Sequence, residues 1–405
     1  METSSPNPLT PSALEGVRVI EMGQLIAGPF CGKTLGEFGA DVIKIEAPGR
    51  GDPLRNWRML KNGTSVWWQV QSRNKRSLAL DLRNPEGQAI ARRLISEADV
   101  LIENFRPGTL EAWGLGWDEL HAINPNLVML RISGYGQTGP YRDLPGFGAI
   151  GEAMGGLRHL TGEPGRVPVR VGISIGDTLA ALHGTIGVLM ALYHRKVNGG
   201  IGQIIDVALH ESVFNVMESL IPEYSAFGAV REAAGSALPG ISPSNAYPCL
   251  DGYVLIAGNG DSIYKRLMET IGRPDLGHAQ DLASNAGRTL RVAELDAAIG
   301  AWTKIQTLHD VLRTLHVARV PAGRVYTAKD IHEDPHYRAR DMILNQTTRD
   351  GDCIEVPGIV PKLSATPGTI RSSAPHLGDD TDGVLQQMGL SLVDIGTLRE
   401  KGIVA

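Results

Sequence analysis

The sequence has few cysteines and no excess of positive charge. Its three cysteines, Cys31, Cys249 and Cys353, are widely separated, which fits neither a disulfide framework nor a metal-binding spacing. The 39 basic residues stand against 44 acidic ones, which leaves a net charge of −5 without a basic block. This balance argues against nucleic acid as a partner.

Long apolar runs and targeting signals are also missing. Charge or glycine interrupts the apolar stretches before they reach the ~20 residues that a bilayer span needs. The first eleven residues carry Glu2 but no Lys or Arg, unlike a secretory signal or a transit peptide. We therefore expect a reduced, cytoplasmic protein that binds neither a membrane nor a metal.

The composition that remains is typical of a globular protein with a substantial core. Of the 405 residues, 42% are hydrophobic and 20% are charged. That length predicts two or three domains. The 49 glycines indicate many tight turns and close backbone approaches.

Short strands and helices alternate over the first half of the chain, which is the signature of a parallel sheet. Strand patterns occur at residues 17–21, 41–46, 77–82, 100–102 and 127–132, and helical patterns occur near residues 30–38 and 86–97. The sequence therefore predicts an α/β protein whose large domain has a Rossmann-like, doubly wound sheet.

A shift in composition divides the rest of the chain. We expect a flexible tail at 1–13, the first part of the large domain at 14–225, and a linker at 226–245 rich in Ala, Gly, Ser and Pro. A smaller α+β domain is predicted at 246–325. Residues 326–405 are expected to return to the large domain, with a hairpin around residues 349–352 and helix from 381 to 401.

Two motif matches fail on their local context. Residues Gly134–Gly139 fit the dinucleotide pattern G-x-G-x-x-G, but Pro140 and Pro145 follow where a helix must begin, which favours a plain glycine loop.

Residues His332–His336 fit the zinc pattern H-E-x-x-H, which needs one continuous helix. Pro335 interrupts that helix at a cost of ~3 kcal/mol, so we expect a loop.

Residues Gly172–Gly176 fit the nucleophile elbow of serine hydrolases, with Ser174 as nucleophile. A strand is expected at 169–171. Gly176 and Asp177 then separate the serine from the helix, which argues against an elbow, and Asp177 is expected as the helix cap. We keep a serine hydrolase as an alternative.

The helix after Asp177 carries small residues on one face, at Ala180, Gly184, Gly187 and Ala191. This stripe predicts close packing against another backbone. Asp177 fits two roles: a cap that bonds the first-turn amides, or a carboxylate that the helix end keeps ionised for nucleophilic attack.

The sequence resembles the class III CoA-transferases, the group that includes formyl-CoA and carnitine CoA-transferases. The motifs that carry this resemblance follow one another along nearly the whole chain: 19–29, 35–46, 74–77, 103–108, 134–140, 334–336 and 374–378. The order and number of these matches are specific to the superfamily. Among its members, the chain is most similar to those that use succinyl-CoA with a dicarboxylic acid.

The resemblance implies a large domain built from both chain ends, a smaller domain between them, and two chains interlocked as a homodimer. It places the catalytic aspartate at Asp177 and the glycine-rich substrate loop at Gly258, Asn259 and Gly260. The residues implied in CoA binding are Leu25, Ile26, Ala27, Leu80, Arg83, Asn104, Phe105 and Arg106. A CoA thioester is then the substrate, and no separate cofactor is expected.

The chain departs from the family pattern at several places. Ala47 replaces a basic residue that the family often has after the second strand, Asp379 and Asp380 stand where the family usually has a histidine, and the substrate loop has only two glycines. The same fold serves acyl-CoA racemases, which need a paired acid and base. Their Gly-His-Asp motif aligns with Gly146–Gly148, where neither Phe147 nor Gly148 can move a proton.

We therefore predict a CoA-transferase that moves CoA from an acyl-CoA donor, expected to be succinyl-CoA, to a small dicarboxylic acid through Asp177. An acyl-CoA racemase and a serine hydrolase remain alternatives. Arg55 and Arg170 are candidates for holding the second carboxylate. A structural role accounts for either arginine equally well.

Overall fold

The computed structural model describes residues 11–405, which form two compact units. The larger unit combines residues 11–158, Val171–Pro222 and Arg338–Ala405. The smaller unit combines His159–Arg170 with Glu223–Tyr337. Both ends of the chain therefore contribute to the larger unit. The sequence placed residues 159–170 in the large domain and read 226–245 as a linker, whereas the structure groups 159–170 with 223–337.

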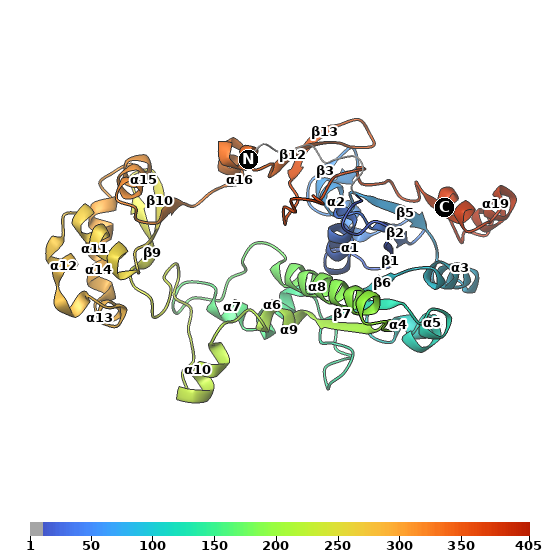
Figure 1. The fold of residues 1–405 in the computed structure, drawn as a ribbon, viewed down its shortest axis with the longest axis horizontal. Helices are drawn as coiled ribbons and strands as arrows, with labels where there is room; N and C mark the ends of the chain where they lie inside the picture. The colour runs from blue at the N-terminus through green and yellow to red at the C-terminus, as the bar shows by residue number, and fades with distance from the viewer. Residues whose placement is uncertain (1–10) are drawn as a thin grey trace. The chain divides into compact units, whose positions relative to one another are not determined.

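A six-stranded parallel sheet forms the centre of the larger unit (Figure 1). Its strands lie in the order β5-β2-β1-β6-β7-β8. In chain order they are β1 (Arg18–Glu21), β2 (Asp41–Glu46), β5 (Lys75–Ala79), β6 (Val100–Glu103), β7 (Val128–Ser133) and β8 (Ile204–Ala208). The predicted parallel sheet is confirmed: five strands lie at or near their expected places, and the sixth, β8, was not predicted.

The strand order reverses between β1 and β6. From β1 the chain first builds outward through β2 to β5, and then returns to add β6, β7 and β8 on the other side. Val19 of β1 pairs with Val42 of β2 and with Val100 of β6. In open α/β sheets, ligands bind in the crevice beyond the carboxyl ends of the strands where the order reverses. The topology therefore predicts a ligand site at the loops that follow Glu21 and Glu103.

Helices α1 (Ala27–Glu37) and α8 (Ile175–Val197) cover one face of the sheet. Neighbouring strand residues alternate between faces, so that Val19, Val42 and Val100 point toward these helices. The stripe of small residues on α8 packs closely, as predicted, but against side chains of β7 and β8 rather than against another backbone. A Cβ added to Gly184 would lie 2.8 Å from Leu130, and one added to Gly187 would lie 2.8 Å from Ile205.

By length and composition, α8 could also cross a membrane. A core helix of a globular protein passes the same test, and the small-residue face of α8 is buried against β7 and β8. These contacts are those of a helix that covers a sheet.

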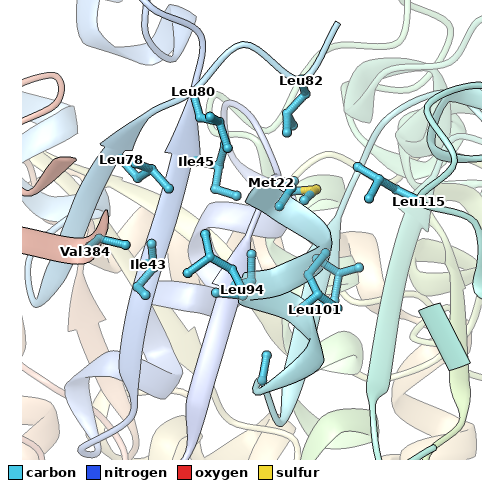
Figure 2. Packing of buried hydrophobic residues seen from close by; sticks show 14 of the residues in the cluster. Met22, Ile43, Ile45, Leu78, Leu80, Leu82, Leu94, Leu101, Leu115 and Val384 are labelled. Carbon is cyan, nitrogen blue, oxygen red and sulfur yellow. The ribbon is translucent and has the colours of Figure 1, made fainter. Parts of the chain in front are cut away.

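The opposite face of the sheet is covered by α3 (Pro85–Ser96), α5 (Trp117–Ile123), α18 (Thr381–Gln387) and α19 (Leu392–Glu400). Figure 2 shows Ile43, Leu78 and Leu101 from the strands packed with Leu94 of α3 and Val384 of α18. Residues from both ends of the sequence thus share one core.

The C-terminal segment is also tied to strand β5 by hydrogen bonds. Leu80 forms an antiparallel bridge with Val404, and the Asp81 amide donates to the Ile403 carbonyl at 2.9 Å. Asp380, one of the departures from the family pattern, accepts a 2.8 Å hydrogen bond from the Ser77 amide. Its carboxylate therefore anchors the start of α18 to the edge strand.

The smaller unit has its own core under a three-stranded antiparallel sheet of order β11-β10-β9. The strands are β9 (Ser244–Cys249), β10 (Gly252–Ala257) and β11 (Ala322–Arg324). The helices of this unit are α11 (Asp261–Thr270), α12 (Pro274–His278), α13 (Asn285–Leu290), α14 (Val292–Thr303) and α15 (Leu308–Val317). The expected α+β character is observed.

Shorter elements complete the chain. The predicted hairpin around residues 349–352 is formed by β12 (Ile343–Thr347) and β13 (Cys353–Pro357), and β3 (Leu60–Lys61) pairs with β4 (Thr64–Ser65). The remaining helices are α2 (Val66–Gln71), α4 (Thr109–Ala112), α6 (Gly148–Met154), α7 (Leu157–Leu160), α9 (Leu209–Phe214), α10 (Leu220–Phe227), α16 (Ala328–Glu333) and α17 (Pro335–Ala339).

A buried ion cluster holds the loop that leaves β1. The Lys44 ammonium lies 2.9 Å from both the Glu21 and the Asp52 carboxylates and donates to the Gly23 carbonyl at 2.6 Å. Asp52 in turn accepts hydrogen bonds at 3.1 Å from the amide of Leu25, which has a φ of 63°. Leucine rarely adopts this left-handed conformation, so the surrounding contacts must maintain it.

The cluster keeps Asp52 ionised. Burial alone would raise the pKa of Asp52, but the charge of Lys44 and the amides of Leu54 and Leu25 outweigh it and hold the pKa below its usual value. A carboxyl group whose pKa is lower in the folded protein than in the unfolded chain stabilises the fold at pH values above its unfolded pKa, which is about 3.9. This stabilisation is lost as the pH falls from there through the lower pKa of the folded protein. Asp52 should therefore stabilise the fold at neutral pH.

We expect Asp52→Asn to lower the free energy of unfolding at pH 7 by about 3 kcal/mol, because Lys44 then lacks one of its buried partners. The difference from the wild-type protein should shrink as the pH falls below about 4. Denaturant unfolding at several pH values measures this, with the exposed Asp382→Asn as a matched control that changes stability little. A difference that stays constant down to pH 3 would contradict the assigned ionisation.

Candidate active site

Two loops face each other beyond the carboxyl ends of β1 and β6. The Asn104 side chain joins them: its Oδ1 accepts a hydrogen bond from the Gln24 amide at 2.7 Å, and its Nδ2 donates to the Gln24 carbonyl at 2.9 Å. Gly23 and Gly28 allow the first loop to fold tightly, since a Cβ on Gly23 would lie 3.1 Å from the Gly28 Cα. The loops thus form one rigid edge at the switch point of the sheet.

Two adjoining cavities open along this edge. The larger, of about 520 Å³, is bordered by Met22, Ala47, Pro48, Arg50, Leu80, Arg83 and Trp113, among others. The narrower, of about 170 Å³, is bordered by Leu25, Ile26, Ala27, Asn104, Arg106, Arg142, Phe147 and Asp177, among others. Gln24 and Phe105 line both cavities, and the Phe105 ring packs edge-on against Trp113 at 5.3 Å.

The structure brings Asp177 and the residues implied in CoA binding to the same edge of the larger unit. Asp177 borders the narrow cavity, and all eight residues implied in CoA binding line one cavity or both. They come from segments as far apart as Leu25 and Asn104, which the parallel sheet places side by side. Gly258, Asn259 and Gly260 belong to the smaller unit, where they connect β10 to α11, so their role stays a prediction.

Asp177 is the third residue of α8, and the expectation that it caps the helix is wrong. The helix begins at Ile175 and Ser174 is its N-cap residue, because the Thr178 amide already donates to the Ser174 carbonyl at 3.1 Å. The strand expected at 169–171 is wrong as well, since Val169 and Val171 are exposed and pair with no strand of the described chain. Asp177 therefore lies within the first turn of the helix, near its positive end, which favours a negative charge.

A glycine allows the backbone to approach the Asp177 carboxylate. A Cβ added to Gly148, the first residue of α6, would lie 2.1 Å from Asp177 Oδ2 and 2.7 Å from its Cγ. Gly176 has a similar role, because its added Cβ would lie 3.0 Å from the Gly148 carbonyl oxygen. These two glycines seat the N-terminal turn of α8 against α6 and fix the carboxylate at the cavity wall.

The glycine loop after β7 forms part of the same wall. Residues Gly134–Gly139 form a turn, and the next helix begins only at Gly148, so the prediction of a glycine loop rather than a dinucleotide site is confirmed. An added Cβ on Gly134 would lie 2.9 Å from the Gly146 Cα. This close approach shapes the segment that carries Arg142 and Phe147.

The zinc pattern is broken where the sequence predicted. Helix α16 ends at Glu333 and α17 begins at Pro335, so His332 and His336 lie on separate short helices rather than on the predicted loop. Within residues 11–405, no three His, Cys, Asp or Glu side chains are grouped as metal ligands.

Arg55 makes structural contacts, which corrects the prediction that it could bind the second carboxylate of the acid. Its Nε and Nη2 donate to the two Glu46 carboxylate oxygens at 2.8 and 2.7 Å, and its Nη1 donates to the Pro375 carbonyl at 3.1 Å. Its guanidinium lies 3.8 Å from the Trp68 ring centroid. Arg170 belongs to the smaller unit and stays a prediction.

Sequence reasoning missed Gln24 and Arg142 as site residues. Gln24 directly precedes the predicted segment 25–27, and its contact with Asn104 spans 80 positions of sequence. Arg142 follows Pro140 in a segment that was judged only by its lack of a helix. No local spacing marks either residue, because the cavity is assembled from six separate segments.

Comparison with known proteins agrees with this geometry. The profile of CoA-transferase family III matches residues 14–381. Succinyl-CoA–D-citramalate CoA-transferase from Chloroflexus aurantiacus is 48% identical over 97% of this chain and 98% of that protein. The beta subunit of succinyl-CoA–L-malate CoA-transferase from the same organism is 42% identical over 96% of this chain and 98% of its own.

Solved structures show the same fold. The crystal structure of a CAIB/BAIF family protein from Brucella suis is 34% identical, has a TM-score of 0.83, and covers 93% of this chain and all of its own. A structure from Mycobacterium tuberculosis is 28% identical, with a TM-score of 0.81 over 92% of this chain and 99% of its own. With the matched profile spanning nearly the whole sequence, this chain belongs to CoA-transferase family III and is an enzyme that transfers coenzyme A.

Proposed function

We propose that this enzyme transfers CoA from succinyl-CoA to a small dicarboxylic acid through acyl intermediates on Asp177. The observation that carries the proposal is the position of Asp177 in the narrow cavity. The segments 25–27 and 104–106, which resemble the family's CoA-contacting segments, line the same cavity. A thioester held along them would place its acyl end within reach of one carboxylate.

The choice of acids rests on the relatives and on charge. The two Chloroflexus proteins described above are named for transfer from succinyl-CoA to D-citramalate and L-malate, and a 33% identical protein from Agrobacterium fabrum is named succinate–glutarate CoA-transferase. All these acids carry two carboxylates. Two arginines, Arg106 and Arg142, line the cavity that holds Asp177, which suits a dianionic substrate.

The proposed reaction begins when an Asp177 carboxylate oxygen attacks the thioester carbonyl carbon. The C–S bond breaks, which leaves a mixed anhydride on Asp177 and a free CoA thiolate. The thiolate attacks the aspartyl carbonyl carbon and releases the donor acid, which gives an aspartyl-CoA thioester. The acceptor carboxylate attacks that thioester and expels the thiolate, which then attacks the acceptor carbonyl and restores the Asp177 carboxylate.

Each step exchanges one activated acyl bond for another of similar energy, so the reaction requires no added source of energy. The developing oxyanions need hydrogen-bond donors. The backbone amides of Ile26, Ala27 and Gly28 are candidates because they lie at the N-terminus of α1, where amides lack helical partners. The loop at Gly258 is the second candidate carried over from the family resemblance.

The racemase alternative lacks its proton-transfer groups. Phe147 borders the cavity and Gly148 lies against Asp177, so the positions that align with the racemase motif are in the site but carry no acid or base. The serine hydrolase alternative lacks its preceding strand, although α8 does begin directly after Ser174, contrary to expectation.

We also propose that the enzyme is a homodimer of interlocked chains. The outer face of α8 exposes a continuous apolar row at helical spacing, made of Leu182, Ile186, Leu189, Met190, Tyr193 and Val197. Soluble monomers rarely leave such a patch open to water. A second copy of the chain is the partner that the family resemblance implies.

We expect Asp177→Ala to reduce CoA transfer by about 10³-fold or more, as does removal of other covalent nucleophiles. CoA binding measured by calorimetry should change little. The assay mixes succinyl-CoA with a pool of small carboxylic acids and detects new CoA thioesters by mass spectrometry. Exposed Asp118→Ala serves as control, and retained transfer in Asp177→Ala would refute the assignment.

Ser174→Ala should retain transfer within about threefold, because the proposed reaction through Asp177 uses no group of Ser174. A fluorophosphonate probe should leave the wild-type protein unlabelled. Labelling that disappears in Ser174→Ala, with free CoA accumulating instead of a new thioester, would favour the hydrolase.

The wild-type protein should sediment at about twice its chain mass of 43.4 kDa. Ile186→Asp places a charge in the apolar row and should shift the protein toward monomer or aggregate, whereas Val393→Asp, at an exposed position on α19, should not. A wild-type protein that sediments at 43.4 kDa across micromolar concentrations would contradict the dimer.

A further inference from the structure

Two arginines line the cavity that contains Asp177, and they differ in their surroundings. Arg106 follows Asn104 and Phe105 on the loop after β6, in the segment implied in CoA binding. Arg142 comes from the long segment between β7 and α6, on the same stretch as Gly148, which contacts the Asp177 carboxylate. Arg142 therefore lies on the segment that leads to the Asp177 contact, whereas Arg106 lies on the segment implied in CoA binding.

The guanidinium of Arg142 is not engaged by a close carboxylate within the described chain. Its recorded ion pair is a long one, with Asp143 Oδ1 at 3.9 Å from its Nε, and Asp143 is almost fully exposed. Hydrogen bonds from Arg131 and, to a smaller extent, the charge of Arg142 lower the pKa of Glu111, whose oxygens are bound by Arg131. Arg131, by contrast, is bound by Glu103 at 2.7 Å and by both oxygens of Glu111. Arg142 thus keeps its donors available for a ligand.

The backbone around Arg142 is fixed, although the side chain is 45% exposed. Its amide donates to the Gly139 carbonyl at 3.3 Å, and the Leu144 amide donates to the Tyr141 carbonyl at 2.9 Å. Gly146 then packs against Gly134. The turn presents Arg142 to the cavity from a braced segment, which is what a specific contact requires.

We infer that Arg142 binds the free carboxylate of the dicarboxylic substrate and thereby selects diacids over monoacids. The inference rests on the proposed transfer through Asp177. Succinyl-CoA keeps one free carboxylate, and a diacid acceptor keeps another while its first carboxylate reacts. One planar guanidinium can pair with each in turn through two parallel hydrogen bonds.

The positive charge of Arg142 would also reduce electrostatic repulsion between the diacid and Asp177. A diacid brings two negative charges into a cavity whose reacting group, Asp177, is itself anionic. Without a cation near the acid, the acceptor would be repelled as it approaches. A monocarboxylic acyl group has nothing for Arg142 to bind, so it leaves the arginine unpaired and gains nothing from it.

The test compares matched donors and acceptors in wild-type and variant enzymes. Succinyl-CoA is compared with butyryl-CoA as donor, and glutarate with pentanoate as acceptor. In Arg142→Gln, kcat/KM for succinyl-CoA and for glutarate should fall about 10- to 100-fold, mainly through KM, as expected for a lost charged hydrogen bond. The values for butyryl-CoA and pentanoate should stay within about threefold of wild type.

Two further variants sharpen the comparison. Arg142→Lys keeps the charge but not the planar fork, so it should recover part of the preference for diacids. Arg399→Gln removes an arginine of similar exposure on α19, paired with Asp382 and bordering neither cavity, and should behave as wild type. Thermal unfolding of each variant verifies that the fold is intact.

The outcomes separate this inference from the proposed function. If the wild-type enzyme transfers CoA to diacids and Arg142→Gln keeps the same diacid-to-monoacid ratio, the inference is wrong and the transferase proposal stands. An equal loss for butyryl-CoA and succinyl-CoA would assign Arg142 to CoA binding and also overturn the inference. Absence of transfer by the wild-type enzyme to any acid would overturn both.

Discussion

The buried contact between Lys44 and the carboxylates of Glu21 and Asp52 supports the whole active-site edge. Breaking a buried ion pair is costly, because it leaves a charge without water or a partner. The cluster therefore fixes the path of the loop after β1, including the left-handed conformation of Leu25. That loop lines both cavities, so a charge cluster inside the fold sets the shape of the site.

A second constraint is the close packing of backbone around Asp177. Gly148 and Gly176 leave no room for a side chain at either position, and the small residues on α8 hold the helix tightly against β7 and β8. The carboxylate is thus placed by glycine contacts, helix position and sheet packing together. Precise placement of a nucleophile is worth several orders of magnitude in rate. The same helix presents its apolar outer face to the proposed partner chain, which links catalysis to assembly.

The two cavities differ in the chemistry of their lining. The larger one has the arginines Arg50 and Arg83 together with the ring of Trp113, which suits the phosphates and the adenine of a nucleotide-like carrier. The narrower one brings Asp177 together with Arg106 and Arg142. The position of Ala47, where the family often has a basic residue, borders the larger cavity, and Arg50 supplies a positive charge three residues later.

The sequence by itself determined the parallel sheet, because buried strands and amphipathic helices follow local periodicity, and it determined the family through motifs in a characteristic order. The catalytic role of Asp177 is what that resemblance implies and stays a prediction. The sequence did not determine where α8 begins. Gly176 and Asp177 have low helix propensity, yet both lie in the first turn of α8, because that turn packs against α6. Nor did the sequence determine the roles of Arg55 and Arg142. Two arginines look alike in a sequence, and only the tertiary structure decided that Glu46 neutralises one while the other faces the cavity. The groups that contact a long side chain can come from segments far away in the sequence. Which groups these are is therefore known only once the chain is folded.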